Sequence, residues 1–272
     1  MPRRQVKIAH FQHFSNCAVT LVTHLVCPFA ARAHIALNVT DTKYKLRETD
    51  LMDKPAWFTE IYQQALGADK GSTGKVPVLQ DGDNVLTESS HVARYVDAKA
   101  RAAGRTSLTP ADPLVAVESE LFGELAGDII KGWYGLLMGQ DAEKQDAART
   151  GLVGTMGKMN EQLLAADARR AKAGEKAGPF IAGESLSFGD VMICPWFVRL
   201  AVLKSHRGFE IPSGLARVAE WSAACDAHPA IKSASKEDDY YVDQYKSYAN
   251  GGMAKIMQQR KEDAEKKAKE EA

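Results

Sequence analysis

The segment CPFA at residues 27–30 constrains the fold of this 272-residue chain more than any other feature. It follows an apolar, β-branched run at residues 18–23, which is typical of a buried strand. It also opens a helix-compatible stretch at residues 28–37, and proline is favoured at the first position of a helix, where its missing N–H is not needed. The sequence therefore predicts a strand, a tight turn, and a helix with Cys27 at its N-cap.

A thiol at the N-cap of a helix is a candidate nucleophile. The unpaired N–H groups and the positive end of the helix dipole favour a thiolate there, so we expect the pKa of Cys27 to fall below the usual value of about 8.5. The alternative is a half-buried cysteine that begins a core helix. This segment alone leaves both interpretations open.

The composition narrows the class of protein. Lys and Arg together number 35, as do Asp and Glu, so the net charge does not indicate a nucleic-acid partner. No apolar run approaches the roughly 20 residues that span a bilayer, and the first residues lack the apolar run of a signal peptide. The four cysteines have neither CxxC nor zinc-ligand spacing, so we expect no metal, a reducing compartment and a cytoplasmic location.

The first half of the chain alternates between strand and helix patterns. Residues 1–16 are predicted to be a surface extension. Within residues 17–101 the pattern predicts strands at 19–23, 43–47, 76–79 and 85–86, with helices at 28–37 and 89–100. A DGDN turn at residues 81–84 joins the last two strands into a hairpin. This order predicts a small mixed sheet with helices on its faces.

The second half is helical after a linker at residues 102–113. Helix-compatible spacings occupy residues 114–138, 143–172, 187–204, 214–227 and 239–250. Ser187 and Asp190 have the form of a capping box, and Pro195 is expected to kink its helix or shift the helix start. The fold class is therefore α/β plus all-α, with a helical domain at 112–250 and a charged, solvated tail at 251–272.

Val76 and Pro77 form the first of several candidate ligand contacts. A proline at the start of a strand cannot complete the hydrogen-bond ladder. A cis bond is one common solution, and it would leave the backbone of Val76 free to pair with an extended peptide. An ordinary proline on an edge strand is the alternative.

The other candidate contacts are charged or polar. Ser89 and the N–H groups at its helix start suit a carboxylate, while Glu88 would accept an ammonium group; plain helix capping is the alternative. Lys54 and Lys75 supply cations for a second carboxylate, although exposed lysines are usually only solvated. Together with Cys27 these groups match the γ-glutamyl head, cysteinyl middle and glycine carboxylate of glutathione, in order along the chain.

These motifs resemble those of cysteine-type glutathione transferases of the omega class and the dehydroascorbate reductase group. The matching segments are CPFA at 27–30, DKPAWF at 53–58, GKVPV at 74–78, ES at 88–89 and GPFIAG at 178–183, the last leading into Asp190. The resemblance covers roughly residues 17–250. It implies a thioredoxin-like N-terminal domain followed by an all-helical C-terminal domain, which together make the glutathione transferase fold.

The resemblance also implies roles for individual residues. Cys27 would be the catalytic nucleophile. Glutathione, as a co-substrate, would be held by Phe29, Lys54, Lys75, Val76, Pro77, Glu88 and Ser89. The acceptor site is poorly matched, and its candidate residues are Trp133, Tyr134, Arg199 and either Tyr240 or Tyr241. Each of these aromatic residues is more often part of a core than of a site.

The resemblance implies a glutathione-dependent thiol transferase or dehydroascorbate reductase. Cys27 would form a mixed disulfide with glutathione, and a second glutathione would resolve it. The position three after Cys27 is Ala30, which favours a mechanism with one cysteine. Two alternatives stay open: a non-catalytic interaction module with this fold, and a protein similar to the intracellular chloride channels. We expect a small-molecule substrate and neither a nucleic-acid nor a membrane partner, and the sequence leaves a homodimer open.

Overall fold

The computed structural model of the chain describes residues 19–253, 255–256, 258–259 and 262. The extension predicted at 1–16 and most of the tail predicted at 251–272 lie outside the described residues. In chain order the elements are β1 (Val19–Thr23), α1 (Pro28–Val39), β2 (Lys45–Glu48), α2 (Ala56–Gln64), β3 (Val78–Asp81), β4 (Asn84–Thr87), α3 (Ser89–Ala102), α4 (Pro113–Glu124), α5 (Ala126–Met138), α6 (Ala142–Lys172), α7 (Phe188–Phe197), α8 (Leu200–Arg207), α9 (Ala216–Ala227), α10 (Pro229–Lys232), α11 (Asp238–Gln244) and α12 (Lys246–Ala249).

The four strands form one mixed sheet in the order β2-β1-β3-β4. β1 runs parallel to β2 and antiparallel to β3, and β3 is antiparallel to β4. The register pairs Val22 with Val78, and Val78 with Thr87. The end of β1, the start of β3 and the ends of β2 and β4 therefore meet at one edge of the sheet.

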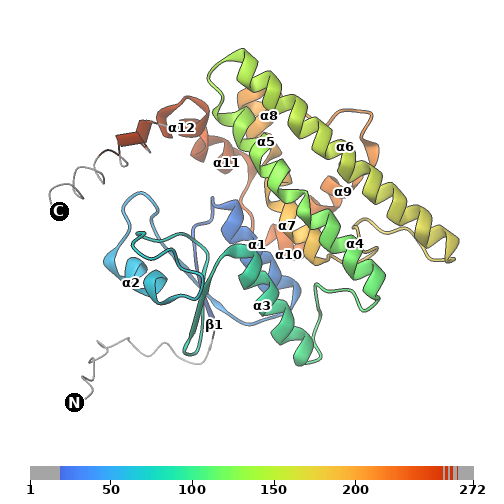
Figure 1. The fold of residues 1–272 in the computed structure, drawn as a ribbon, viewed down its shortest axis with the longest axis horizontal. Coiled ribbons are helices and arrows are strands. Elements are labelled where there is room, and N and C mark those ends of the chain that lie inside the picture. The colour runs from blue at the N-terminus through green and yellow to red at the C-terminus, as the bar shows by residue number, and fades with distance from the viewer. Residues whose placement is uncertain (1–18, 254, 257, 260–261, 263–272) are drawn as a thin grey trace.

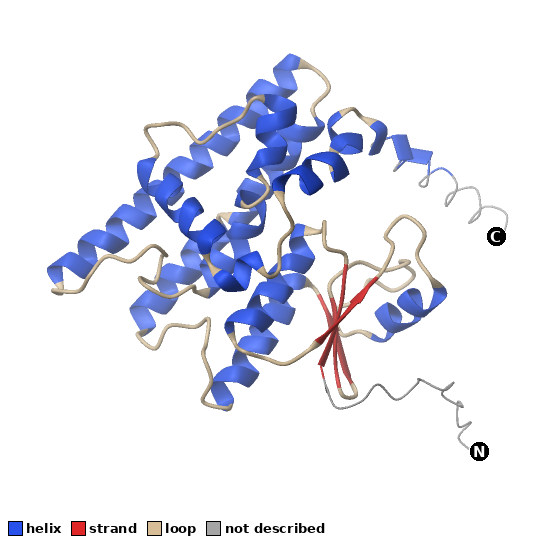
Figure 2. Cartoon of the chain, turned by 180° about the vertical axis from the view of Figure 1, so that it is seen from behind, coloured by secondary structure: helices blue, strands red, loops and turns tan. Residues whose placement is uncertain are grey.

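Helices cover both faces of the sheet. α1 and α3 lie on one face and α2 lies on the other (Figure 2). Successive side chains of a strand point to opposite faces, and accordingly Leu21 belongs to the core under α1 and α3 whereas Val22 belongs to the smaller core under α2. The sheet is thus buried on both sides.

The helical domain packs on the outer side of α1 and α3 (Figure 1). α7 is wholly buried between this layer and the other helices, and its residues share one continuous core with α1. α1 therefore lies between the sheet and the second domain. Residues of both domains surround its N-terminus, next to Cys27. The predicted α/β plus all-α organisation is confirmed.

Several local predictions are confirmed as well. The Val76–Pro77 peptide bond is cis. Ser187 and Asp190 form the predicted capping box at the start of α7. Pro195 does not shift the start of the helix, since it lies inside α7, which begins after the capping box and ends at Phe197.

Three predicted helices are in fact pairs of helices, and two short helices, α2 and the four-residue α10, were not predicted. Residues 114–138 divide into α4 and α5 at Leu125, residues 187–204 divide into α7 and α8 at Arg199, and residues 239–250 divide into α11 and α12 at Tyr245. Leu125 has near-helical backbone angles, so the helical spacing runs across the break and hides it. α2 was missed because it has only nine residues, which give little periodicity.

Candidate functional site

A cavity of about 680 Å³ lies at the sheet edge where the strand ends converge. The topology explains this placement, since Cys27 follows β1, Lys54 follows β2, Val76 precedes β3 and Ser89 follows β4. The predicted glutathione-site residues that line the cavity are Cys27, Phe29, Lys54, Lys75, Val76, Glu88 and Ser89. Pro77 is buried next to Val76 and does not belong to the lining.

Cys27 occupies the N-cap of α1, as predicted, and its N–H donates to the carbonyl of His24 (2.9 Å). The residue is only half-buried, but its surroundings are dense enough that burial raises the pKa of the thiol. The backbone N–H groups of Ala30 and Phe29 act in the opposite direction, followed by the charges of Arg199 and Arg32. The sequence predicted a lowered pKa for Cys27, and the structure gives a raised one because desolvation outweighs the helix terminus.

Ser89 and Glu88 stand at the start of α3. Ser89 is the first residue of the helix and is buried, whereas Glu88 is exposed and has a φ of 70°, a left-handed conformation that few non-glycine residues adopt. Such backbone strain concentrates at functional sites. Neither side chain caps the helix, so plain capping does not explain the pair.

The two cationic side chains of the cavity differ in how they are held. Lys54 is half-buried, and its Nζ donates to Thr73 Oγ1 (3.0 Å) and to the carbonyl of Gly74 (2.8 Å). Lys75 is exposed. Gly74, which precedes Lys75, has a φ of 105°, and a Cβ there would lie 2.9 Å from the ring of Phe58 on α2. Only glycine therefore fits at this position.

Sequence reasoning missed Arg32, which lies behind the cavity wall. Its Nη1 donates to Ser89 Oγ (3.3 Å), while Nε and Nη2 donate to the carbonyl of Met192 in the second domain (3.0 and 2.7 Å). Burial lowers the pKa of Arg32 to about 10, so it keeps its charge at neutral pH. Arg32 lies five residues after Cys27, on the first turns of α1, and this spacing could have indicated that it lies near the site.

A second cavity of about 270 Å³ adjoins the first and shares Cys27 with it. Tyr134, Tyr245 and Tyr248 line this chamber, together with Met52. The hydroxyls of Tyr134 and Tyr245 are hydrogen-bonded to each other, and the Tyr245 hydroxyl donates to the carbonyl of Val26 (3.2 Å). Burial raises the pKa of both tyrosines, so these hydroxyls stay neutral. The chamber is an apolar, aromatic space that opens on the Cys27 side chain.

Of the predicted acceptor-site residues, only Tyr134 lines these cavities. Trp133 is buried in the helical core, and Arg199 is fully buried as well. Tyr240 is 39% exposed and lies outside both linings, whereas its neighbour Tyr241 is buried. Tyr248 was missed, although it lies only a few residues after the candidates Tyr240 and Tyr241. Neighbours in sequence point in different directions on a helix, and the sequence pattern did not resolve which one faces the site.

The described residues contain no group of three or more His, Cys, Asp or Glu side chains that could hold a metal ion. None of the helices they form combines the length and apolar character that crossing a bilayer requires.

Comparison with known families identifies the fold. The family model described as the glutathione S-transferase N-terminal domain matches residues 21–104, and the model of the C-terminal domain matches residues 142–224. The chain belongs to the glutathione S-transferase family. The transferase therefore has the thioredoxin-like and all-helical domains that the sequence motifs implied.

Individual relatives point to the same group. The transferase is 30% identical to pyrimidodiazepine synthase of Drosophila melanogaster over 186 residues, which are 67% of this chain and 65% of that protein. It is 26% identical to glutathione S-transferase omega-1 of Sus scrofa over 208 residues, or 76% of each chain. It is 23% identical to glutathione S-transferase DHAR2 of Arabidopsis thaliana over 225 residues, or 82% of this chain and 91% of that one.

A solved structure shows the same fold. Glutathione transferase Omega 3C from Trametes versicolor superposes with a TM-score of 0.71 at 18% identity, covering 88% of this chain and 94% of that one. The predicted resemblance to omega-class transferases and dehydroascorbate reductases is confirmed, and the protein is a glutathione transferase enzyme.

Proposed function

We propose that this transferase is a glutathione-dependent thiol transferase and dehydroascorbate reductase with Cys27 as its single catalytic cysteine. One observation carries the proposal: Cys27 is shared by both cavities, one with the charges that glutathione needs and one that is apolar and aromatic. A sulfur in this position would be reached by glutathione from one side and by an acceptor from the other.

The larger cavity complements glutathione in charge. Glutathione carries two carboxylates and one ammonium group. Ser89 and the N-terminus of α3 would bind the γ-glutamyl carboxylate, and Glu88 its ammonium. Val76 would pair with the peptide backbone, which leaves Lys54 and Lys75 for the glycine carboxylate. Phe29 lines the wall next to Cys27, and Pro77 would contribute only through its neighbour Val76, which lines the cavity.

The chemistry follows from one thiol. In the thiol transferase reaction the Cys27 thiolate attacks the glutathione sulfur of a mixed disulfide, the S–S bond breaks, and the acceptor leaves as a thiolate that takes a proton from water. A second glutathione thiolate then attacks the glutathione sulfur bound to Cys27. Oxidised glutathione leaves, and the Cys27 thiolate is regenerated. With dehydroascorbate the two electrons come from two glutathione molecules, which are oxidised to the disulfide as ascorbate forms.

The other described cysteines support a mechanism with one cysteine. Cys194 and Cys225 are fully buried in the helical domain. Neither of them lines the two cavities, whereas Cys27 lines both. Ala30 occupies the position where a dithiol motif would have its second cysteine.

The smaller cavity, which would be the acceptor site, suits small acceptor molecules. Met52 and Met253 contribute unbranched side chains that adjust to different shapes, and Tyr134 and Tyr248 add flat walls. A relative of this chain is named a DHAR-type glutathione S-transferase, which supports dehydroascorbate as one acceptor.

Turnover measurements test this function. We expect glutathione-dependent reduction of a model mixed disulfide and of dehydroascorbate to exceed conjugation of a chlorinated aromatic compound. Cys27→Ser should lose both reductions, because a hydroxyl does not exchange with a disulfide. Cys194→Ser is the matched control and should keep them. Unchanged reduction by a folded Cys27→Ser protein would contradict the proposal.

A further inference from the structure

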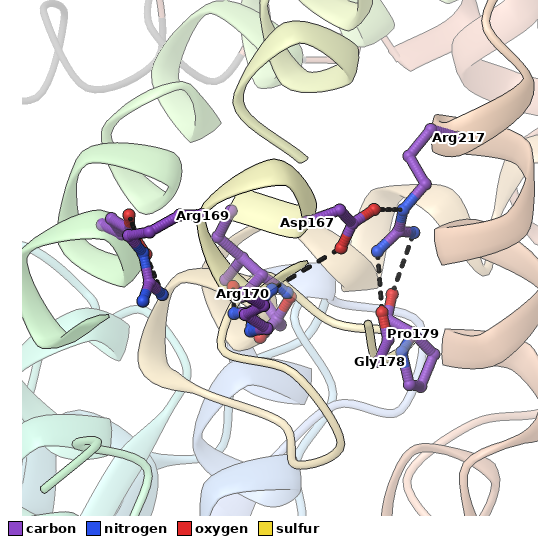
Figure 3. Close-up of polar contacts among 9 residues, drawn as sticks. Asp167, Arg169, Arg170, Gly178, Pro179 and Arg217 are labelled. Atoms are coloured by element: carbon purple, nitrogen blue, oxygen red, sulfur yellow. Dashed lines mark hydrogen bonds and ion pairs between the residues drawn. The ribbon is translucent and has the colours of Figure 1, made fainter. Parts of the chain in front are cut away.

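Four arginines of the described chain are buried, and they divide into two kinds. Arg32, Arg170, Arg199 and Arg217 are 7%, 3%, 0% and 7% exposed. A buried charge is costly unless an opposite charge accompanies it. For Arg170 and Arg217 that charge is Asp167, whose carboxylate lies 3.6 Å from Arg170 Nη1 and 2.7 Å from Arg217 Nε (Figure 3). Each of these two arginines therefore has a carboxylate partner within the helical domain, although the single charge of Asp167 balances only one of them.

Arg32 and Arg199 are held differently. Within the described part of the chain neither has a carboxylate at ion-pair distance, and backbone carbonyls accept their hydrogen bonds. Each guanidinium also lies over an aromatic ring, 4.7 Å from Trp196 for Arg32 and 4.2 Å from Tyr241 for Arg199. These contacts satisfy the N–H groups but leave two positive charges without an anion.

Both arginines cross between the two domains. Arg32, on α1, donates to the carbonyl of Met192 on α7 (2.7 Å). Arg199, at the start of α8, donates to the carbonyls of Val26 (3.2 Å) and Leu25 (3.4 Å), in the loop that ends at Cys27. Arg199 thus reaches the Cys27 segment only when the two domains are packed together, whereas Arg32 lies on α1, in the same domain as Cys27.

The two arginines flank Cys27 in the sequence of contacts: Arg199 donates to the two residues before it, and Arg32 lies on the helix that follows it. Both arginines favour the ionised form of the Cys27 thiol electrostatically. Arg32 in addition touches Ser89, the predicted contact of a glutathione carboxylate. A thiolate at Cys27 would be the missing anion, and a bound carboxylate near Ser89 would add to it.

We propose that Arg32 and Arg199 are positioning residues that stabilise the Cys27 thiolate, and that docking of the two domains is what assembles this pair of charges. The proposal rests on the proposed role of Cys27. It gives the second domain a part in the chemistry of a thiol that belongs to the first. Without the two charges, only the backbone N–H groups of Ala30 and Phe29 would oppose the effect of burial on the thiol.

Other titratable or charged groups also surround the Cys27 thiol. The titratable or charged groups that face Cys27 or Arg32 from the packed elements are His24 in the preceding loop, Tyr134 on α5, Cys194 on α7, Tyr245 and Tyr248 near α12, and Lys54, Lys75 and Glu88 in the cavity wall. The tyrosines are neutral at physiological pH, because burial raises their pKa. Arg32 and Arg199 are the guanidinium groups that act on the thiol from buried positions.

The pH dependence of Cys27 alkylation tests the proposal. The rate of iodoacetamide modification of Cys27, mapped by peptide mass spectrometry without glutathione, gives the pH midpoint of the thiol. Arg32→Gln and Arg199→Gln keep hydrogen-bonding groups but remove the charge. Each should raise the midpoint by about one pH unit, which is about a tenfold slower modification below the midpoint. Arg32→Lys and Arg199→Lys keep the charge and should stay closer to the wild-type midpoint.

Arg217→Gln is the matched control, since it removes a buried charge that already has Asp167 as its partner. It should lower stability and leave the midpoint unchanged. The proposal is overturned if folded glutamine variants keep the wild-type midpoint, if the lysine variants shift as far as the glutamine variants, or if Arg217→Gln shifts as much. A single folded glutamine variant is enough for this test, because the two arginines belong to different domains and each is replaced separately. Retained turnover in Cys27→Ser would instead contradict the proposed function and leave this titration result standing.

Discussion

Replacement of Ser89 by alanine should weaken glutathione binding while sparing the chemical step. Ser89 is buried at the first position of α3 and lines the cavity, and its hydroxyl accepts a hydrogen bond from Arg32 (3.3 Å). The proposed γ-glutamyl carboxylate would accept a hydrogen bond from this hydroxyl. A hydrogen bond to a charged group contributes about 1.5–3 kcal/mol, so Ser89→Ala should raise the dissociation constant roughly tenfold to a hundredfold.

The fold should tolerate this substitution. Ser89 makes no side-chain cap of α3, and Arg32 retains its two hydrogen bonds to Met192. The lost contact with Arg32 should cost about 1 kcal/mol of stability. Isothermal titration with glutathione gives the affinity, and saturation kinetics should show the change in the glutathione KM with little change in kcat.

Ser90 offers a matched control. It follows Ser89 on the same helix, is half-buried and does not line the cavity. Ser90→Ala should bind glutathione as the wild type does. Equal affinities for Ser89→Ala and the wild type, in proteins with similar unfolding midpoints, would refute the head-group assignment to Glu88 and Ser89.

Two further predictions concern stability. Asp190 is fully buried and accepts hydrogen bonds from Ser187, Ile181 and Trp221, so Asp190→Ala should lower the free energy of unfolding by about 3 kcal/mol or more; a loss below about 1 kcal/mol in urea titrations would contradict this. Burial lowers the pKa of His34 to about 4, so the unfolded chain gains a proton near pH 6.5 while the folded protein does not, and stability should fall by up to about 3 kcal/mol as the pH drops from about 6.5 to 4. His34→Phe should flatten this part of the stability curve, and an unchanged slope would show that other groups control it.

Most of the residues that line the larger cavity could be predicted from the sequence because their placement depends on local features. Cys27, Val76 and Ser89 each lie at a strand end or helix start that the sequence pattern marks. Strand order then brings these ends to one edge of the sheet, where the cavity lies. The resemblance to a known family supplied that order before the register was known.

The remaining features depend on contacts between distant segments, which the pattern does not encode. The pKa of Cys27 is raised by burial in a site that Tyr134 and Tyr248 help to enclose, more than 100 residues further along the chain. Arg199 was interpreted as an acceptor-site residue, yet it is buried with its hydrogen bonds directed to the loop before Cys27. Trp133 is an aromatic residue of the same predicted helix as its neighbour Tyr134, but its side chain is buried in the core.

The identity of the sulfur that forms the mixed disulfide is the most direct test of the account. The wild-type protein and Cys27→Ser would be incubated with oxidised glutathione, and intact-mass and peptide spectra would then be recorded before and after addition of reduced glutathione. The account predicts one glutathione on the wild type, located at Cys27 and removed by reduced glutathione, and none on the Cys27→Ser protein. Glutathione attached to another cysteine, together with full reductase activity of the Cys27→Ser protein, would contradict it.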